Sequence, residues 1–143
     1  MMAFYGGKPS KTPSRFAAGF FLYWWTEISY FCGMEFSQSR HAEIAALVAQ
    51  CIGFEWDAGN IGKNWDSHNV AENESEEVFN NAPLMFGDDT KHSMHETRFM
   101  ALGKTDGNRL VSNMFTIRGN LVRIISSQDM SKGNRRTYGT AST

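Results

Sequence analysis

The sequence predicts an α+β fold, in which helices pack against an antiparallel sheet. Two observations indicate the sheet. Residues 98–127 contain three short segments rich in the β-branched and aromatic residues that favour strands. Arg118-Gly119-Asn120 separates the last two segments and is typical of a tight hairpin turn. Helical patterns lie before and after the strands, so we expect a sheet of about four strands, two helices on its N-terminal side and a short C-terminal helix.

The length of 143 residues and the 41% of hydrophobic residues indicate one domain with an extension. We expect residues 1–52 to be the extension and residues 53–143 to be the working domain. Met1 to Ser14 is rich in residues that disfavour order and is expected to be disordered. Apolar residues at helical spacing then predict a helix near residues 37–51, with Ser37 or Ser39 as its N-cap.

Phe16 to Phe31 is an apolar, aromatic run that follows basic residues. A membrane span needs about 20 apolar residues, and Glu27 interrupts this shorter run. A signal peptide would be followed by a cleavage site with small residues, which the sequence lacks. Alternatively, the natural chain starts at Met34. We expect no membrane association and a cytoplasmic location, and the role of the extension stays open.

The working domain begins with a short strand, Phe54–Asp57, in which Phe54 and Trp56 alternate. Asp57 is a suitable N-cap for a helix over residues 58–67. A second helix over residues 74–80 is capped by Asn73, and its early glutamates suit the helix dipole.

Pro83 ends the second helix and opens a strand over residues 83–87, which a polar loop follows. Strands over residues 98–104, 109–117 and 121–127 come next, and Ser131 caps a basic helix over residues 130–138. Alternation places Arg123 on the face opposite the apolar residues Val122 and Ile124, with Ser126 on their side. An arginine in mid-strand must be exposed, paired or bound to a ligand.

Charge is unevenly distributed along the chain, although the formal net charge is −1. Residues 53–97 hold ten acidic residues and two lysines, a net charge of −8, and residues 98–143 hold eight basic and two acidic residues, a net charge of +6. Either the two halves neutralise each other in the fold, or the basic half forms a surface for phosphates.

The sequence predicts no metal site and no cofactor. Cys32 and Cys51 suggest neither a disulfide framework nor a CxxC metal motif, and in an exported chain the alternative is that the two form a bridge. His92 and His95 lie in the polar loop, but no third and fourth ligand follow at zinc-site spacing.

Four segments between Phe54 and Tyr138 resemble one family, in the right order and spacing. The chain resembles the BrnT-type ribonuclease toxins of bacterial type II toxin–antitoxin systems, which implies a RelE-like fold. The segments are FEWD (Phe54–Asp57), NWDSHNV (Asn64–Val70), HSMHETRFMALG (His92–Gly103) and FTIRGNLVRIIS (Phe115–Ser126).

The resemblance implies a metal-independent endoribonuclease that inhibits translation. In such chemistry a ribose 2′-hydroxyl attacks the adjacent phosphate, so a base, an acid and cations are needed. By matching position, Arg98, Arg118 and Arg123 would hold the phosphate and His68 would serve in acid–base catalysis. Instead of binding phosphate, these arginines could form salt bridges, above all between Arg123 and Glu55.

The resemblance also implies partners. These are a cognate BrnA-like antitoxin, an RNA substrate, and promoter DNA reached only through the antitoxin complex. The basic residues of the last helix either bind RNA or are solvated. Tyr138 is either a packing residue or a catalytic residue. Trp56 and Trp65 either lie in the core or stack on RNA bases. The basic residues are Lys132, Arg135 and Arg136.

Four positions depart from the family pattern. Gln128 stands where an arginine is expected, Asn60 and Ser67 where lysines are expected, and Asn134 where a glutamate is expected. Loss of one transition-state contact typically costs on the order of 10²–10³ in rate. The alternative function is therefore a catalytically impaired homologue that acts only as an antitoxin-binding module.

Overall fold

The computed structural model describes residues 37–142. The expectations for Met1–Ser14, for the apolar run Phe16–Phe31 and for a start at Met34 concern residues outside this range. The described elements are α2 (Gln38–Ala49), β1 (Gly53–Phe54), α3 (Lys63–His68), α4 (Glu72–Asn80), β2 (Met85–Asp88), β3 (Phe99–Lys104), β4 (Leu110–Arg118), β5 (Leu121–Asp129) and α5 (Lys132–Ser142).

The sheet has five strands in the order β1-β5-β4-β3-β2. The pairs from β2 to β5 are antiparallel, and β1 pairs parallel to β5 through Phe54 and Val122. The expected α+β class is confirmed, but the sheet is mixed and has one strand more than predicted. The additional strand is β1, which lies where the sequence predicts a short strand at Phe54–Asp57. It is only two residues long, and local sequence patterns do not reveal that it joins the sheet in parallel with β5 through a long crossover.

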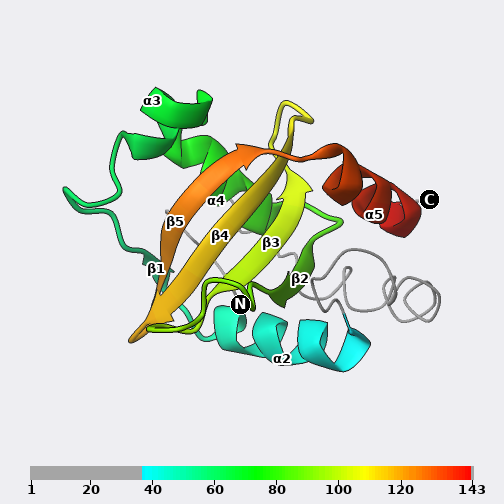
Figure 1. The fold of residues 1–143 in the computed structure, drawn as a ribbon, viewed down its shortest axis with the longest axis horizontal. Helices are drawn as coiled ribbons and strands as arrows, with labels where there is room; N and C mark the ends of the chain where they lie inside the picture. The colour runs from blue at the N-terminus through cyan, green and yellow to red at the C-terminus, as the bar shows by residue number, and fades with distance from the viewer. Residues whose placement is uncertain (1–36, 143) are drawn as a thin grey trace.

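Helices cover the two faces of the sheet unequally (Figure 1). On one face, α2 and α4 cover an aromatic core in which Phe79 and Phe115 meet edge to face at 5.2 Å between ring centroids. On the other face, a smaller cluster of Met85, Met100, Leu102, Met130 and Tyr138 packs under α5. We call this second side the α5 face.

A β-bulge in β5 changes which residues face the core. Phe115 pairs with Ile124 and Met114 pairs with Ser126, so Ile125 is left without a partner. The alternation then shifts by one residue, and Ser127 rather than Ser126 is fully buried on the side of α3 and α4. The prediction that Ser126 shares a face with Val122 and Ile124 is therefore wrong, because strict period-two alternation ends at the bulge.

A buried polar network joins the two central helices to the sheet. The Ser75 hydroxyl lies 2.8 Å from the Ser127 hydroxyl, which in turn hydrogen-bonds the Asn113 side chain. Asn113 donates to the Ser75 carbonyl at 2.8 Å, and the Ser127 amide donates to Asn64 Oδ1 at 2.9 Å. All four residues are nearly inaccessible to solvent, so this network fixes α3 and α4 on the sheet.

Helix α2 packs against the exposed edge of the sheet. Its buried His41 accepts a hydrogen bond at Nδ1 from the Phe86 amide at 3.1 Å, which satisfies an edge N–H of β2. Arg40 binds both oxygens of Asp88 at 2.6 and 2.9 Å, and Ile44 and Val48 enter the aromatic core. The predicted helix near residues 37–51, with Ser37 as its N-cap, is confirmed.

Candidate active site on the α5 face of the sheet

Three arginines lie at one end of the α5 face. Arg118 ends β4, Arg123 lies in β5 opposite Thr116, and Arg98 directly precedes β3. Continuing the β3–β4 register by one residue places Arg98 level with Thr116, so Arg98, Thr116 and Arg123 form a row across three strands. We call Arg98, Arg118 and Arg123 the arginine cluster.

Three carboxylates share this end of the sheet with the arginine cluster. Arg123 binds Asp57 at 2.7 and 3.0 Å and Glu55 at 3.1 Å. Arg118 binds both oxygens of Glu96 at 2.8 and 3.2 Å, and its Nη1 lies 3.7 Å from Glu55. Glu55 therefore bridges two arginines. The predicted salt-bridge alternative for Arg123 is present in the structure, and both arginines remain on one surface.

The charges of the cluster act on one another. A hydrogen bond from Arg118 lowers the pKa of Glu96, and the charges of Arg98 and Arg123 lower it further. A hydrogen bond from Arg123, with one from the Gly59 amide, lowers the pKa of Asp57. Because all three guanidinium groups influence Glu96, the arginines form one electrostatic unit.

Arg98 differs from the other two arginines because one of its donors has no partner. Its Nε atom is buried and lacks a hydrogen bond, the one such side-chain atom among the residues that the structure describes. A buried, unsatisfied donor on a charged group is costly. This arrangement is typical of a site that is completed when an anionic acceptor binds.

Gly59 allows the close packing around Arg123. A Cβ atom at this position would lie 3.1 Å from Arg123 Nη2 and 3.0 Å from Asp57 Oδ1. A side chain here would therefore crowd the Arg123–Asp57 pair, and the ends of these two side chains would have to shift slightly to admit it. Asn60 anchors the same turn, because its amide donates to the carbonyls of Glu55 and Ile124 at 2.9 and 3.1 Å.

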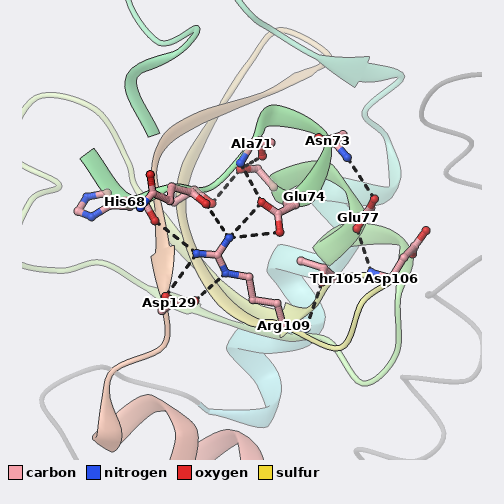
Figure 2. A network of polar contacts seen from close by, with 12 residues as sticks. His68, Ala71, Asn73, Glu74, Glu77, Thr105, Asp106, Arg109 and Asp129 are labelled. Atoms are coloured by element: carbon pink, nitrogen blue, oxygen red, sulfur yellow. Dashed lines mark hydrogen bonds and ion pairs between the residues drawn. The ribbon is translucent and has the colours of Figure 1, made fainter. Parts of the chain in front are cut away.

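His68 lies far from the arginine cluster. Its charge influences Asp129, which is six residues from Arg123 along β5, roughly 20 Å at the usual rise per strand residue. The imidazole is exposed at the end of α3, and Figure 2 shows it pointing away from Arg109. The structure therefore brings together Arg98, Arg118 and Arg123 and does not bring His68 to them.

Arg109 organises the end of the sheet near His68, and no motif in the sequence distinguishes it from the other arginines. It binds Asp129 at 2.8 Å, Glu74 at 3.1 Å and the carbonyls of His68 and Asn69 at 3.3 and 2.7 Å (Figure 2). These bonds raise the pKa of Arg109, the one to Asp129 most. One guanidinium thus ties the C-terminus of α3 and the first turn of α4 to both β4 and β5.

The basic residues of α5 border the same face of the sheet. Lys132, Arg135 and Arg136 are exposed, and Arg135 donates from Nε to the Met130 carbonyl at 3.0 Å. Tyr138 is buried and donates its hydroxyl to the Pro83 carbonyl at 2.7 Å, so it packs in the structure. Met100 and Leu102 follow Arg98 along β3 and belong to the hydrophobic cluster under α5, so the arginine cluster and α5 lie along the same face of the sheet.

The departures from the family pattern differ in their surroundings. Asn60 is buried and holds the β1–α3 turn, whereas Ser67 and Gln128 are exposed. Gln128 pairs with Ser112 on the α5 face.

The two tryptophans of the domain differ in exposure. Trp65 is 55% exposed, so the prediction that it lies in the core is wrong. Trp56 is partly buried, and its indole N–H donates to Glu76 at 2.7 Å.

No group of three or more His, Cys, Asp or Glu side chains within residues 37–142 is arranged to hold a metal ion. None of the helices in this range has the length and apolar character needed to cross a membrane.

Comparison with known proteins gives one match. Residues 56–134 match the sequence model of a family described as "Ribonuclease toxin, BrnT, of type II toxin-antitoxin system". No curated protein matches the chain. The matched residues include α3, α4, the four strands β2 to β5, and the start of α5, whereas α2 and β1 lie before them.

Proposed function

The chain belongs to the BrnT family of ribonuclease toxins of type II toxin–antitoxin systems, and from this premise we propose that it cleaves RNA at the arginine cluster without a metal ion. Membership implies a toxin with a ribonuclease role, an RNA target and a cognate antitoxin. We further propose that cleavage inhibits translation in the cytoplasm. A BrnA-like antitoxin would neutralise the toxin, and the complex would reach promoter DNA through the antitoxin. A RelE-like fold belongs to the same proposal.

One observation supports this site above the others: three arginines from three strands share one end of one sheet face. A guanidinium fork meets two phosphate oxygens at once and stays charged at every relevant pH. Cleavage by a 2′-hydroxyl places extra negative charge on the phosphorus oxygens in the transition state, and fixed cations stabilise that charge. The buried, unpartnered Nε of Arg98 supports an anionic ligand at the same place.

The basic residues of α5 would extend the site. Exposed Lys132, Arg135 and Arg136 would contact the RNA backbone beyond the scissile phosphate. His68 would then serve a separate role, because it lies at the far end of β5. A catalytic centre at that end, with His68 and Arg135 around Asp129, is the competing location.

Expression in cells without antitoxin tests the activity and its location together. We expect wild-type protein to stop growth and degrade RNA, and Arg123→Ala to reduce this activity by on the order of 10²-fold, the usual effect of losing one transition-state contact. Arg40→Ala is a matched control, because Arg40 also binds two carboxylates but lies in α2. Toxicity that survives Arg123→Ala and disappears with His68→Ala would move the site to the far end of β5. A folded wild-type protein that leaves growth and RNA intact would refute the ribonuclease activity.

A second candidate function is an antitoxin-binding module without cleavage. Gln128 favours it, since an exposed amide occupies a position on the α5 face where the family pattern has an arginine. Gln128→Arg tests it: a silent protein that becomes toxic on this change supports the impaired homologue. If the protein stays non-toxic after this change, Gln128 is not the cause of the missing ribonuclease activity.

A further inference from the structure

The three carboxylates of the arginine cluster are not equivalent. Asp57 uses both oxygens, because Oδ1 accepts from Arg123 and the Gly59 amide and Oδ2 accepts from Arg123. Glu96 also uses both oxygens, since Oε1 and Oε2 accept from Arg118. In Glu55 all contacts with the arginines involve Oε2. The Oε1 atom of Glu55 accepts no hydrogen bond from any described residue.

Glu55 is also the most firmly positioned of the three. It directly follows β1, and its amide donates to the Val122 carbonyl at 2.9 Å, which continues the parallel ladder. Its neighbour Phe54 is anchored in the aromatic core. The side chains of Glu55 and Glu96 are each 31% exposed, compared with 51% for Asp57, so Glu55 is accessible to a ligand, and its place on the parallel ladder rather than its exposure distinguishes it from Glu96. A group on a paired strand is held more precisely than one on a loop.

From these observations we propose that Glu55 is the general base of RNA cleavage. The inference rests on the proposed ribonuclease function and adds a named proton acceptor to it. Two arginines that contact Oε2 would hold a phosphate beside Glu55, so that a ribose 2′-hydroxyl reaches the unpartnered Oε1. A base must come within hydrogen-bond reach of the proton that it removes.

The step balances without a metal or a redox partner. The 2′-hydroxyl proton passes to Glu55 Oε1 while the 2′-oxygen forms a bond to phosphorus. The bond from phosphorus to the 5′-oxygen breaks, and that oxygen takes a proton from solvent water. The products are a 2′,3′-cyclic phosphate and a 5′-hydroxyl, and the Glu55 proton returns to solvent. Arg118 and Arg123 stabilise the charge on the phosphoryl oxygens throughout.

Glu55→Gln removes the base but preserves the shape of the side chain, and Glu43→Gln is its matched control, because Glu43 also pairs with an arginine but lies in α2. Single-turnover cleavage of a mixed-sequence single-stranded RNA is measured, with a second arm that contains purified ribosomes and messenger RNA. We expect Glu55→Gln to lower the rate by on the order of 10²-fold or more, within the usual contribution of a general base. Glu43→Gln is expected to stay within tenfold of wild type. A 2′-deoxy oligonucleotide of the same sequence lacks the attacking hydroxyl, so it can bind but cannot be cleaved. Its affinity should not weaken in either variant.

Two further readouts separate a base from a merely structural residue. The wild-type rate should fall in acid as a carboxylate takes up its proton, and Glu55→Gln should lack this acid limb. A substrate with a sulfur leaving atom at the 5′ position needs no acid, so it should not rescue a missing base.

The outcomes are distinct from those that test the ribonuclease function. If wild-type protein cleaves and Glu55→Gln cleaves equally well, or is rescued by the sulfur substrate, the assignment of Glu55 is overturned and the function stands. If folded wild-type protein cleaves RNA in neither arm, both proposals fail. Thermal unfolding of each variant checks that the fold is retained.

Discussion

The side chain of Arg109, just before β4, contacts α3, α4 and β5. Its guanidinium binds the carboxylates of Asp129 and Glu74 and two backbone carbonyls at the end of α3. The Arg109 side chain is 28% exposed. A helix C-terminus leaves carbonyls without intrahelical partners, and a cation there satisfies them. Arg109 therefore closes the open end of the β4–β5 hairpin against both helices.

Replacing Arg109 with alanine should destabilise the fold by about 1–3 kcal/mol, since each partly buried partner would be left unsatisfied. Urea denaturation at neutral pH measures the change. Arg109→Lys keeps the charge but loses the planar fork, so it should recover only part of the lost stability. A denaturation midpoint for Arg109→Ala equal to that of wild type would show that water replaces these contacts without cost.

Arginines have different roles in this chain, and their positions along the sequence do not reveal which role each one has. Arg98, Arg118 and Arg123 were selected from the family pattern, and their location on one sheet face agrees with period-two alternation. Arg109 carries a similar charge in the same region, yet its partners lie in elements that only the folded chain brings near. Asn60 matches a family lysine in the sequence and is a buried turn anchor in the structure.

At the scale of elements, α2 depends on a neutral histidine. Burial lowers the pKa of His41 from 6.5 to about 4, because the imidazolium would be desolvated while its Nδ1 accepts from the Phe86 amide. The charged groups that the structure describes on α2 and β2 include Arg40, Glu43 and Asp88, and Arg40 pairs with both acids. The imidazole therefore attaches α2 to β2 only in its neutral form.

The stability of wild-type protein should fall as the pH drops below 6.5. Below pH 6.5 the imidazole of His41 takes up a proton in the unfolded chain, whereas in the folded protein it stays neutral until about pH 4. The unfolded state therefore binds more protons than the folded state, and the free energy of unfolding decreases. The full shift corresponds to a loss on the order of 3 kcal/mol. Carboxylates with lowered pKa values, Glu96, Asp57 and Asp129, lose their stabilising effect at more acidic pH, below their ordinary values of 4.5 and 3.8.

His41→Asn provides the matched comparison, since its amide oxygen accepts a hydrogen bond but the side chain does not titrate. Urea denaturation of both proteins between about pH 4.5 and pH 6.5 should show a steeper decline for wild type. Equal slopes would mean that His41 is protonated in the folded state or that its burial is not maintained in solution.

Most elements were predicted from the sequence because their signals are local. The Gly/Asn turn at Gly119, the apolar repeat of α2 and the β3–β5 strands depend on neighbouring residues and are confirmed. The predicted helix over residues 58–67 is shorter, because Gly62 at φ 73° precedes a helix that starts at Lys63. The bulge at Ile125 and the parallel pairing of β1 arise from contacts between distant strands, so no local pattern contained them.

At the scale of the whole molecule, the fold extends beyond the family match. Residues 56–134 match the family, yet Ile44, Val48, Cys51 and Phe54 belong to the same aromatic core as α4 and the sheet. The division at residue 53 between an extension and a working domain remains a proposal. The packing of α2 indicates that the two parts share one core.

A chain that begins at Gly53 should be much less stable than one that begins at Ser37. Losing the burial of Ile44 and Val48 alone removes about 1.5–3 kcal/mol per side chain, and whole domains are stable by only about 5–15 kcal/mol. Circular dichroism and urea denaturation of the two chains measure the difference. Equal midpoints would show that α2 is an accessory helix and that residues 53–143 fold independently.

The position of Arg109 has a consequence for the order of events in folding. Its partners lie on α3, α4 and β5, so the contacts form only after three separate segments have docked. Interactions that are absent from the folding transition state control the rate of unfolding rather than the rate of folding. We therefore expect Arg109→Ala to speed unfolding more than it slows folding, so that a folded molecule opens sooner while a new chain collapses at nearly the same speed.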